Sequence, residues 1–448
     1  MSTVILGGGI IGSSIAYYLT RDSSPRKNEE VHIIESSSQL FSAASGYAAG
    51  FLAKNWFASS VAPLGALSFN LHHELAAENG GAEKWGYMKS TALSLDVSDA
   101  PGRTGLRGAR GDDWLRQGTS RAEAAAKIEN PSLTLLQNEA PAWLTKQRGG
   151  RVENISHGET AAQVDPPRLC RFLMDTATSR GVKLHHPAQA TSIITDPVTG
   201  TLNGIKIQDL NTKTEFIIPC RNLVICAGPW TAQVFKTLFP SSGARIPISQ
   251  LAGYSLLLRS PRHTVDQERE TYGGRSHAVF TTYPPSCGFS PEIFSRHGAE
   301  IYIAGLNSTQ IPLPARAEES PAAMQKEQID ELKKVAVRLL GKPAEGRVES
   351  SEDVPNMDDL EVVREALCFR PVTNRGTPIV SRVRDDLLGG DVKTEFEDGP
   401  VEGRRNGGVF IASGHGPWGI SLSLGTGKVV AEMIDGVETS ADITGLGV

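Results

Sequence analysis

The stretch "TVILGGGIIGSS", residues 3–14, decides the expected fold of this 448-residue chain. An apolar run leads into Gly7, Gly9 and Gly12, which have the spacing G-x-G-x-x-G, and a run with helical apolar spacing follows. A second apolar run, "VHIIE", ends in Glu35, which lies 23 positions after Gly12. This order of strand, glycines, helix, strand and acidic residue is typical of a βαβ unit that binds a dinucleotide.

Each part of this unit has a physical role in such a site. Gly7 permits a tight turn, Gly9 lets a pyrophosphate approach the backbone, and Gly12 lets the helix pack closely on the strand. The helix N-terminus presents free N–H groups and the positive end of its dipole to phosphates. Glu35 is placed to bind a ribose hydroxyl, and its charge disfavours the extra phosphate of NADP. The unit alone leaves NAD and FAD open, and a glycine-rich turn without a ligand is the plain alternative.

Composition narrows the class of protein. Hydrophobic residues make up 39% and charged residues 21% of the chain, enough for packed cores in two or three domains. The net charge of −5 argues against a nucleic-acid binder, and no apolar run predicts a membrane span. The ten histidines show no metal-ligand spacing. Five scattered cysteines without a C-x-x-C pair, and no pattern of a secretory signal, indicate a cytoplasmic protein.

Three further stretches are rich in glycine or other small residues. "SSSQLFSAASGYAAGFLA", residues 36–53, is suited to run along a long flat ligand, or is a loop rich in Ser and Ala. "LVICAGPWT", residues 223–231, is an apolar strand that ends in Ala-Gly, where a backbone meets a pyrophosphate or a sheet simply closes. "SGHGPWGISL", residues 413–422, follows the apolar run "GVFIAS" and precedes "GTGK" and a helical run. Its glycines permit close approach to a flat or charged group, or form a tight loop.

Together these stretches resemble the D-amino-acid oxidase superfamily of FAD-dependent oxidoreductases, and within it fungal oxidoreductases. The resemblance covers most of the chain as six ordered segments. They are "VILGGGIIGSSIAYYL" with "VHIIE", "SAASGYAAGFLA", "AAQVDPPRLCRFLMDTATSRGVKLHHPAQATSI", "LVICAGPWT", "CFRPVTNRGTPIV" and "GVFIASGHGPWGISLSLGTGKVVAEMI".

The resemblance implies an α/β fold with two domains and a bound FAD. A Rossmann-like FAD-binding domain is expected in three pieces, 1–85, 160–240 and 365–448. A mainly antiparallel substrate domain is expected at 86–159 and 241–364, where "MKSTALSLDV", "GYSLLLR", "HAVFTTY" and "AEIYIAGL" have strand patterns. The active site is expected between the two domains.

The resemblance also places the Gly-His-Gly loop beside the isoalloxazine ring. The following helix would aim its N-terminus at the flavin C2 carbonyl, where reduced flavin carries negative charge. The expected cofactor-binding residues are Gly7, Gly9, Ile10, Ile11, Gly12, Glu35, Ser36, Ser45, Gly46, Ala48, Ala49, Gly50, Ala190, Ala227, Gly228, Trp230, Arg370, Gly414, His415, Gly416, Trp418, Gly419 and Ile420.

The segment "CFRPVTNRGTPIV" carries the expected chemistry. Arg370 matches the arginine with which amino-acid oxidases of the superfamily bind the substrate carboxylate, and a structural arginine before a proline is the alternative. A guanidinium suits a carboxylate because two parallel hydrogen bonds set its orientation. Cys368 lies near the cysteine that binds flavin covalently in sarcosine and fructosyl amino acid oxidases. We predict a free thiol here, as is common for a buried cysteine.

Other pocket candidates have weaker signals. Lys54, Asn55 and Trp56 follow the small-residue stretch, and Tyr254 and Tyr283 lie in the expected substrate domain.

Three functions remain open from the sequence. The first is oxidation of a small amine or amino acid by hydride transfer to FAD, with oxygen as the final acceptor. The second is a flavin dehydrogenase of a hydroxy acid or other carboxylate that uses another acceptor. The third is a FAD-holding protein that acts by binding a partner, for which the Arg- and Gly-rich stretch 101–121 is the one hint. The substrate, its stereochemistry and the oligomeric state are not determined by these patterns.

Overall fold

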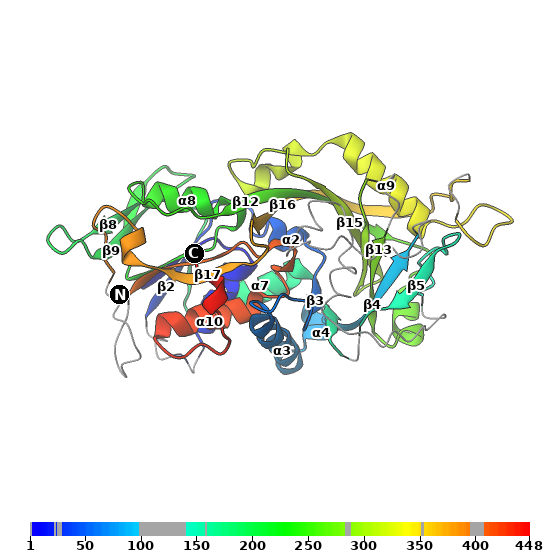
Figure 1. Ribbon diagram of the computed structural model, residues 1–448, viewed down its shortest axis with the longest axis horizontal. Coiled ribbons are helices and arrows are strands. Elements are labelled where there is room, and N and C mark those ends of the chain that lie inside the picture. The colour runs from blue at the N-terminus through cyan, green and yellow to red at the C-terminus, as the bar shows by residue number, and fades with distance from the viewer. Residues whose placement is uncertain are drawn as a thin grey trace.

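The computed structural model describes residues 2–21, 24, 29–97, 140–156, 159–282, 288–350, 354–394 and 407–448. The stretch 101–121 therefore lies outside the described residues. In Figure 1 a six-stranded sheet and both chain termini occupy one half of the molecule, and most of a nine-stranded sheet occupies the other. Two long strands, β12 (Ile248–Arg259) and β16 (Glu361–Thr373), lie near the middle of this view.

The six-stranded sheet has the predicted βαβ unit at its centre. Its strand order is β17-β18-β11-β1-β2-β7, in which β17 alone runs antiparallel to its neighbour. The strands are β1 (Ser2–Leu6), β2 (Glu30–Ile34), β7 (Lys183–His185), β11 (Asn222–Ile225), β17 (Ile379–Val383) and β18 (Gly408–Ser413). Because β2 ends at Ile34, Glu35 emerges at its carboxyl end, as the sequence predicted.

Side-chain alternation along β1 divides the surrounding core into two layers. Ile5 packs in a buried cluster with helices α1 (Ile10–Leu19), α7 (Pro166–Ser179) and α10 (Ser423–Asp435). Val4 and Leu6 point the other way, as a strand requires, and pack with α8 (Thr231–Leu238) and a three-stranded sheet. That sheet consists of β8 (Ala188–Thr195), β9 (Leu202–Asp209) and β10 (Glu215–Pro219).

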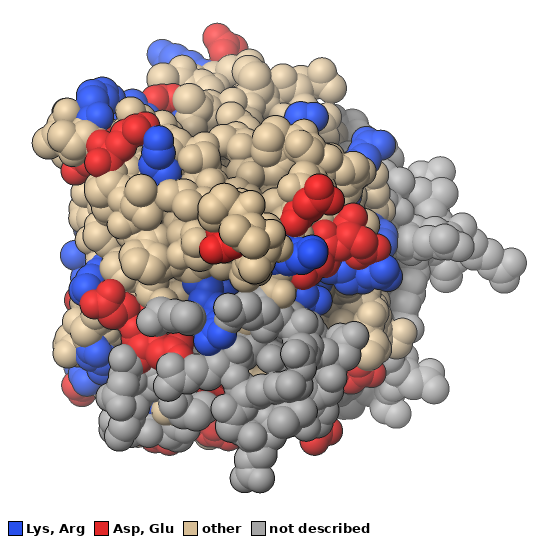
Figure 2. Space-filling view, turned by 90° about the vertical axis from the view of Figure 1, so that its left-hand side faces the viewer, with Lys and Arg blue, Asp and Glu red and all other residues tan. Residues whose placement is uncertain are grey.

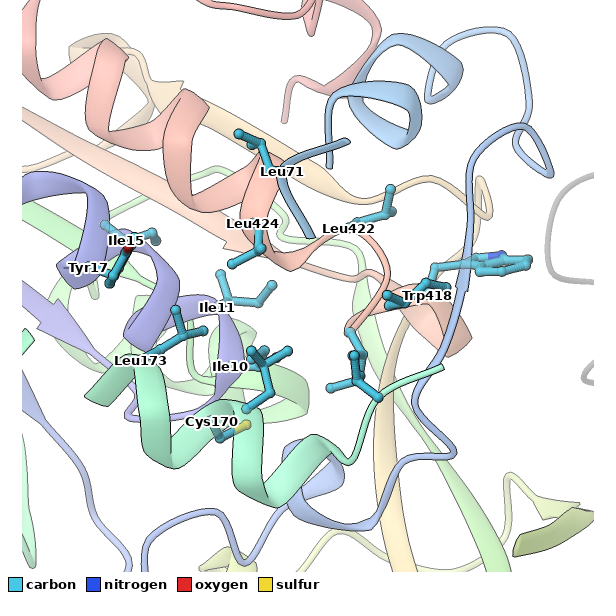
Figure 3. Close-up of a cluster of buried hydrophobic side chains, with 14 of the residues drawn as sticks. Ile10, Ile11, Ile15, Tyr17, Leu71, Cys170, Leu173, Trp418, Leu422 and Leu424 are labelled. Carbon is cyan, nitrogen blue, oxygen red and sulfur yellow. The ribbon is translucent and has the colours of Figure 1, made fainter. Parts of the chain in front are cut away.

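Helix α1 is enclosed by the other two helices of its layer. In Figure 3, Ile10, Ile11 and Ile15 of α1 face Leu173 of α7 and Leu424 of α10. A Cβ atom at Gly427 of α10 would lie 2.6 Å from Cβ of Ser14, so small residues let α1 and α10 approach closely. The N-terminus of α1 is thereby held firmly at the carboxyl end of β1.

The nine-stranded sheet is mainly antiparallel. Eight strands follow the order β16-β12-β15-β14-β13-β4-β6-β3, β5 pairs with β4, and β13 runs parallel to β4. The further strands are β3 (Phe51–Ala53), β4 (Met88–Asp96), β5 (Arg151–Asn154), β6 (Ala161–Gln163), β13 (Ser276–Thr282), β14 (Glu292–Arg296) and β15 (Glu300–Ser308). Together with the parallel sheet they confirm the predicted α/β fold.

One face of this sheet is covered by helix α9 (Lys326–Leu340). Leu256 of β12, Ile303 of β15 and Phe369 of β16 pack in one buried cluster with Leu332 and Leu339 of α9. The intervening residues of the same strands point to the opposite face because side chains alternate along a strand. Alternation therefore turns Tyr302 and Cys368 away from α9 and toward the cavity.

The remaining helices lie between or beside the two sheets. They are α2 (Ala44–Tyr47), α3 (Ala62–Asn79) and α4 (Gly81–Trp85), with short 3₁₀ turns at Gly228–Trp230, Ala317–Ala323 and Gly416–Trp418. Among the described residues, no helix is long and apolar enough to cross a membrane. On the described part of the face in Figure 2, basic and acidic side chains are interspersed, so neither sign forms a continuous patch there.

Candidate active site

A cavity of about 630 Å³ separates the two sheets. On one side it is lined by residues that follow the carboxyl ends of β1, β2, β11 and β18. On the other side it is lined by residues of β14, β15 and β16. Ligands of open α/β sheets bind beyond the carboxyl ends of parallel strands, so this position favours a ligand site.

The glycine turn after β1 is shaped so that no side chain fits. Gly7 has a φ of 116°, which favours glycine, and a Cβ atom there would lie 2.6 Å from the carbonyl oxygen of Cys226. A Cβ atom at Gly9 would lie 2.9 Å from Oγ of Ser45. That hydroxyl accepts a hydrogen bond from the Ile10 amide at 3.0 Å. Gly7, Gly9, Ile10 and Ile11 line the cavity, so the glycine turn and the N-terminus of α1 form part of its wall.

Glu35 closes one end of this turn. Its Oε2 accepts a hydrogen bond from the Gly8 amide, and its Oε1 accepts one from the Ser37 amide, both at 2.8 Å. Glu35 and Ser36 both line the cavity. The carboxylate is thus held beside the turn on which the dinucleotide motif places a ribose.

The loop between β18 and α10 forms the opposite end. His415, Gly416, Gly419 and Ile420 line the cavity there. The His415 ring is buried and its Nε2 lies 3.1 Å from Oγ1 of Thr426 on α10. Burial lowers the pKa of His415 to about 3, so the imidazole is neutral near pH 7 and brings no positive charge to the cavity.

Buried neutral histidines predict a loss of stability in acid. Burial lowers the pKa of His72, His263 and His277 to about 4 and that of His415 to about 3. The unfolded chain, with histidine pKa values near 6.5, therefore binds protons first. Stability should be fully present above about pH 6.5 and fall between about pH 6.5 and 4, by about 1.4 kcal/mol per pH unit for each histidine. Urea unfolding at pH 7, 6 and 5 measures this slope.

The His263→Phe variant is the matched control for that slope. Neither ring nitrogen of His263 has a hydrogen-bond partner among the described residues, and its ring packs near Trp143 and Tyr272. Phenylalanine keeps an aromatic ring at this position and cannot take up a proton. The free energy of unfolding should therefore fall less steeply in acid, by the uptake of one proton fewer. An unchanged slope would contradict the assignment of His263 as a histidine that is neutral in the folded protein.

Three side chains of the nine-stranded sheet hold the small-residue stretch in place. Arg296, buried at 2% exposure, donates through Nε to the Ala49 carbonyl at 3.1 Å and through Nη2 to that of Ala48. The Tyr302 hydroxyl donates to the Tyr47 carbonyl at 3.0 Å, and the Arg364 guanidinium lies 4.9 Å from the centre of the Tyr47 ring. These bonds fix the backbone from residue 47 to 49 at the cavity wall.

Arg370 lies on the wall that β16 contributes. Its Nη1 donates to Oδ1 of Asn307 on β15 at 2.7 Å. Strand β12 runs between β16 and β15. Its residue Gly253 pairs with Asn307 of β15 on one side and with Cys368 of β16 on the other. A Cβ atom at Gly253 would overlap Nη1 of Arg370. The missing side chain therefore lets the guanidinium cross β12 to reach the asparagine.

Cys368 also lines the cavity, two residues before Arg370. It is buried and free, as are Cys170, Cys220 and Cys226, and burial raises the pKa of its thiol. A protonated thiol is a poor nucleophile. We therefore expect FAD to be released when the purified protein is precipitated with acid. Yellow colour that stays with the washed pellet would show a covalent bond and contradict this prediction.

Most of the residues predicted to bind cofactor line the cavity, and four do not. Gly12 packs α1 against β1, since a Cβ atom there would overlap the Gly7 carbonyl. Gly46 meets the backbone of residue 41, and Gly414 approaches Thr373. Trp418 packs edge-on against Phe57, with ring centres 4.9 Å apart. Those that line the cavity are Gly7, Gly9, Ile10, Ile11, Glu35, Ser36, Ser45, Ala48, Ala49, Gly50, Ala190, Ala227, Gly228, Trp230, Arg370, His415, Gly416, Gly419 and Ile420.

Of the weaker candidates, the four that the structure describes do not line the cavity. Trp56 is buried against Phe280, and Lys54 and Asn55 precede it outside the set of lining residues. Tyr254 is on the α9 side of β12, where its hydroxyl accepts a bond from the Gln325 amide at 3.2 Å. Tyr283 lies outside the described residues.

Several polar residues of the cavity wall or its support were not predicted from the sequence. They include Glu292, Tyr302, Asn307 and Arg316. The alternation in "AEIYIAGL" could have placed Tyr302 and Ala304 on one face, because residues two apart share a face of a strand. The other three have no local signal.

A cavity between a dinucleotide-binding glycine turn of a parallel sheet and a second, mainly antiparallel sheet is typical of a dinucleotide-dependent oxidoreductase. The family model described as "DAO: FAD dependent oxidoreductase" matches residues 2–433. The chain belongs to this family of FAD-dependent oxidoreductases.

Relatives and solved structures match the chain along nearly its whole length. "Putative oxidoreductase C1F5.03c" of Schizosaccharomyces pombe is 26% identical, over 98% of this chain and 96% of that protein. "Putative oxidoreductase TDA3" of Saccharomyces cerevisiae is 24% identical, over 99% and 93%. Glycine oxidase from Geobacillus kaustophilus has the same fold, with a TM-score of 0.66, 21% identity, and 100% and 97% of the two chains covered.

The residues present fit FAD. Gly7, Gly9, Ile10 and Ile11 line the cavity, the Glu35 carboxylate is held beside them by the Gly8 and Ser37 amides, and the cavity continues past Gly228 to the loop that contains His415. Among the described residues, no group of three or more His, Cys, Asp or Glu side chains is arranged to bind a metal ion.

We predict that Glu35→Ala weakens FAD retention without unfolding the chain. The variant loses the expected charge-assisted hydrogen bond to the ribose, at a cost of about 1–3 kcal/mol, which is about fivefold to 150-fold in affinity. Flavin fluorescence released on dilution measures the change. Glu35→Gln keeps a hydrogen-bond acceptor, so its FAD retention should lie between those of the unchanged protein and Glu35→Ala. Equal FAD retention by all three proteins would contradict the ribose contact.

Proposed function

We propose that the protein oxidises a small amine or amino acid that carries a carboxylate, with oxygen as the acceptor of the electrons. The observation that supports this best is Arg370 in the wall of the cavity, bonded to the neutral amide of Asn307. No carboxylate of the described residues forms an ion pair with Arg370. A charged guanidinium in a partly enclosed cavity is costly without an anionic partner, and a substrate carboxylate is a partner of suitable shape.

The chain's own residues would bind and orient this substrate. Arg370 offers parallel N–H donors, and the bond from its Nη1 to Asn307 limits the rotation of the guanidinium plane. FAD, when bound, supplies the hydride acceptor. The N-terminal end of α10 and the preceding glycine loop would stabilise negative charge that develops beside them. Apolar side chains such as Phe51 and Ile420 reduce the access of water to the same space.

The names of the fold neighbours are compatible with this proposal. They include glycine oxidase, iminodiacetate oxidase from Chelativorans sp. BNC1 and L-amino acid deaminase from Proteus myxofaciens. The compartment we propose is the cytoplasm, where the four buried thiols would stay reduced.

Anaerobic reduction of the bound flavin by a panel of compounds tests the proposal. The panel contains amines, D- and L-amino acids, N-substituted amino acids and hydroxy acids, and loss of the flavin absorbance is followed. Reduction by an amino compound with a carboxylate, and hydrogen peroxide on admitting oxygen, supports the proposed oxidase. Reduction by hydroxy acids with a dye but no peroxide would favour the dehydrogenase. Flavin that none of these compounds reduces would favour a protein that acts by binding a partner.

A further inference from the structure

The cavity has a wall that the dinucleotide motif does not supply. Residues 309–325, which connect β15 to α9 and are called the clasp here, place Ala315, Arg316 and Ala317 against the cavity. This connection belongs to neither the glycine turn nor the loop after β18.

The clasp is bonded to the parallel sheet at two points on either side of Arg316. Nε1 of Trp230, just beyond β11, donates to the Pro314 carbonyl at 2.8 Å. The amide of Ser38, just beyond β2, donates to Oε2 of Glu318 at 2.7 Å. Strand β1 lies between β11 and β2 in the sheet. Both bonds involve residues that follow neighbours of β1, and Arg316 lines the same cavity as Gly7 and Gly9 of the turn after β1.

The positive charge of Arg316 is opposite to that of the diphosphate expected at the glycine turn. Two basic side chains, Arg316 and Arg370, are found among the described residues that line the cavity. Arg370 belongs to the wall that β16 contributes, whereas Arg316 belongs to the clasp. Nε and Nη2 of Arg316 bond to Oε1 of Glu319 at 3.1 and 3.0 Å. Nη1 of Arg316 also lies 3.6 Å from Oε1 of Glu318, so two carboxylates that are absent from the described lining residues pair with this guanidinium.

We propose that Arg316 binds the diphosphate of FAD and that the clasp holds it there. The N-terminus of α1 contacts a diphosphate from the sheet side through N–H groups. A guanidinium across the cavity supplies charge-assisted hydrogen bonds from the other side. FAD retention then depends on a segment attached to the nine-stranded sheet as well as on the βαβ unit.

The test is the release of FAD from the purified holoenzyme of Arg316→Met, followed by flavin fluorescence. Methionine keeps much of the aliphatic side chain and removes the charge. Release should be about tenfold to a hundredfold faster than in the unchanged protein, the loss expected for a hydrogen bond to a charged group. Raising the salt concentration should accelerate release from the unchanged protein more than from the variant, because salt screens the ion pair.

Competition by nucleotide fragments shows whether the phosphate is the group recognised. ADP should compete with FAD for the full chain less well after Arg316→Met, whereas competition by adenosine should not change. Arg384→Met is the control, since Arg384 is 75% exposed and paired with Asp386. Arg316→Lys should restore part of the retention. Unchanged FAD release, or equal weakening of ADP and adenosine, would overturn the proposal.

The anchoring role of Trp230 is tested by a double-mutant cycle. Trp230→Phe removes the N–H donor to Pro314 and should speed FAD release. If Trp230 acts by holding the clasp, its effect should largely disappear in the Arg316→Met background. Additive effects would show that Trp230 acts independently and would overturn this part of the proposal.

Discussion

Replacing Arg370 with lysine is expected to weaken substrate binding and slow flavin reduction together, by about 2–5 kcal/mol, which is about thirtyfold to several thousandfold. Lysine keeps the positive charge, but a single ammonium cannot form two parallel hydrogen bonds to a carboxylate. It also cannot keep both the Asn307 contact and the orientation of the substrate. Misorientation raises the barrier to hydride transfer in addition to lowering affinity.

Stopped-flow reduction of the flavin over a range of substrate concentrations separates the two effects. Asn307→Leu is the companion variant, because it leaves Arg370 charged and removes the bond at 2.7 Å. It should slow reduction less than Arg370→Lys does, and it should leave FAD retention unchanged. An Arg370→Lys enzyme with normal reduction kinetics, or a substrate that lacks any carboxylate, would refute the assigned role.

Gly12→Val is expected to destabilise the protein by about 3 kcal/mol or more and to reduce FAD retention by about a hundredfold. A Cβ atom at this position would overlap the Gly7 carbonyl and lie 3.2 Å from Sγ of Cys226. Helix α1 is enclosed by α7 and α10, so it cannot move aside without repacking both contacts. Its N-terminus would therefore shift away from the glycine turn, where the diphosphate is expected.

Urea unfolding and flavin fluorescence measure these two losses separately. Gly243→Ala is the matched control, since a Cβ atom at Gly243 would meet no atom within 4 Å. Its stability and FAD retention should differ little from those of the unchanged protein. A Gly12→Val protein of normal stability that retains FAD normally would show that close packing of α1 on β1 is unnecessary.

The features predicted well from the sequence are those whose determinants lie close together along the chain. The strand, glycine turn, helix and acidic residue span residues 2–35, and their geometry follows from local φ values and alternation. The structure places Gly7, Gly9 and Glu35 as predicted, around one turn. The apolar strand patterns of the second sheet were equally readable, because alternation with period 2 is a local property.

Four residues that we predicted to bind the cofactor do not line the cavity, and their contacts show what a local sequence pattern leaves open. Gly12, Gly46, Gly414 and Trp418 lie in the predicted segments, but each packs against protein atoms and none lines the cavity. A glycine that lets backbone approach a ligand and one that lets backbone approach backbone have the same sequence pattern. Whether a glycine contacts a ligand or another backbone segment depends on which sheet, helix or loop packs against it in the folded protein.

By itself, the sequence determined the cofactor class, the βαβ unit and the alternating strands, because short-range chain geometry and the resemblance carry that information. Only the tertiary structure decided which distant groups meet. Asn307 reaches Arg370 because Gly253 leaves space on the strand between them, and Arg316 lines the cavity on a clasp that is bonded to Trp230 and Ser38. These contacts join residues tens to hundreds of positions apart, and their formation depends on the packing of two sheets that no local pattern records.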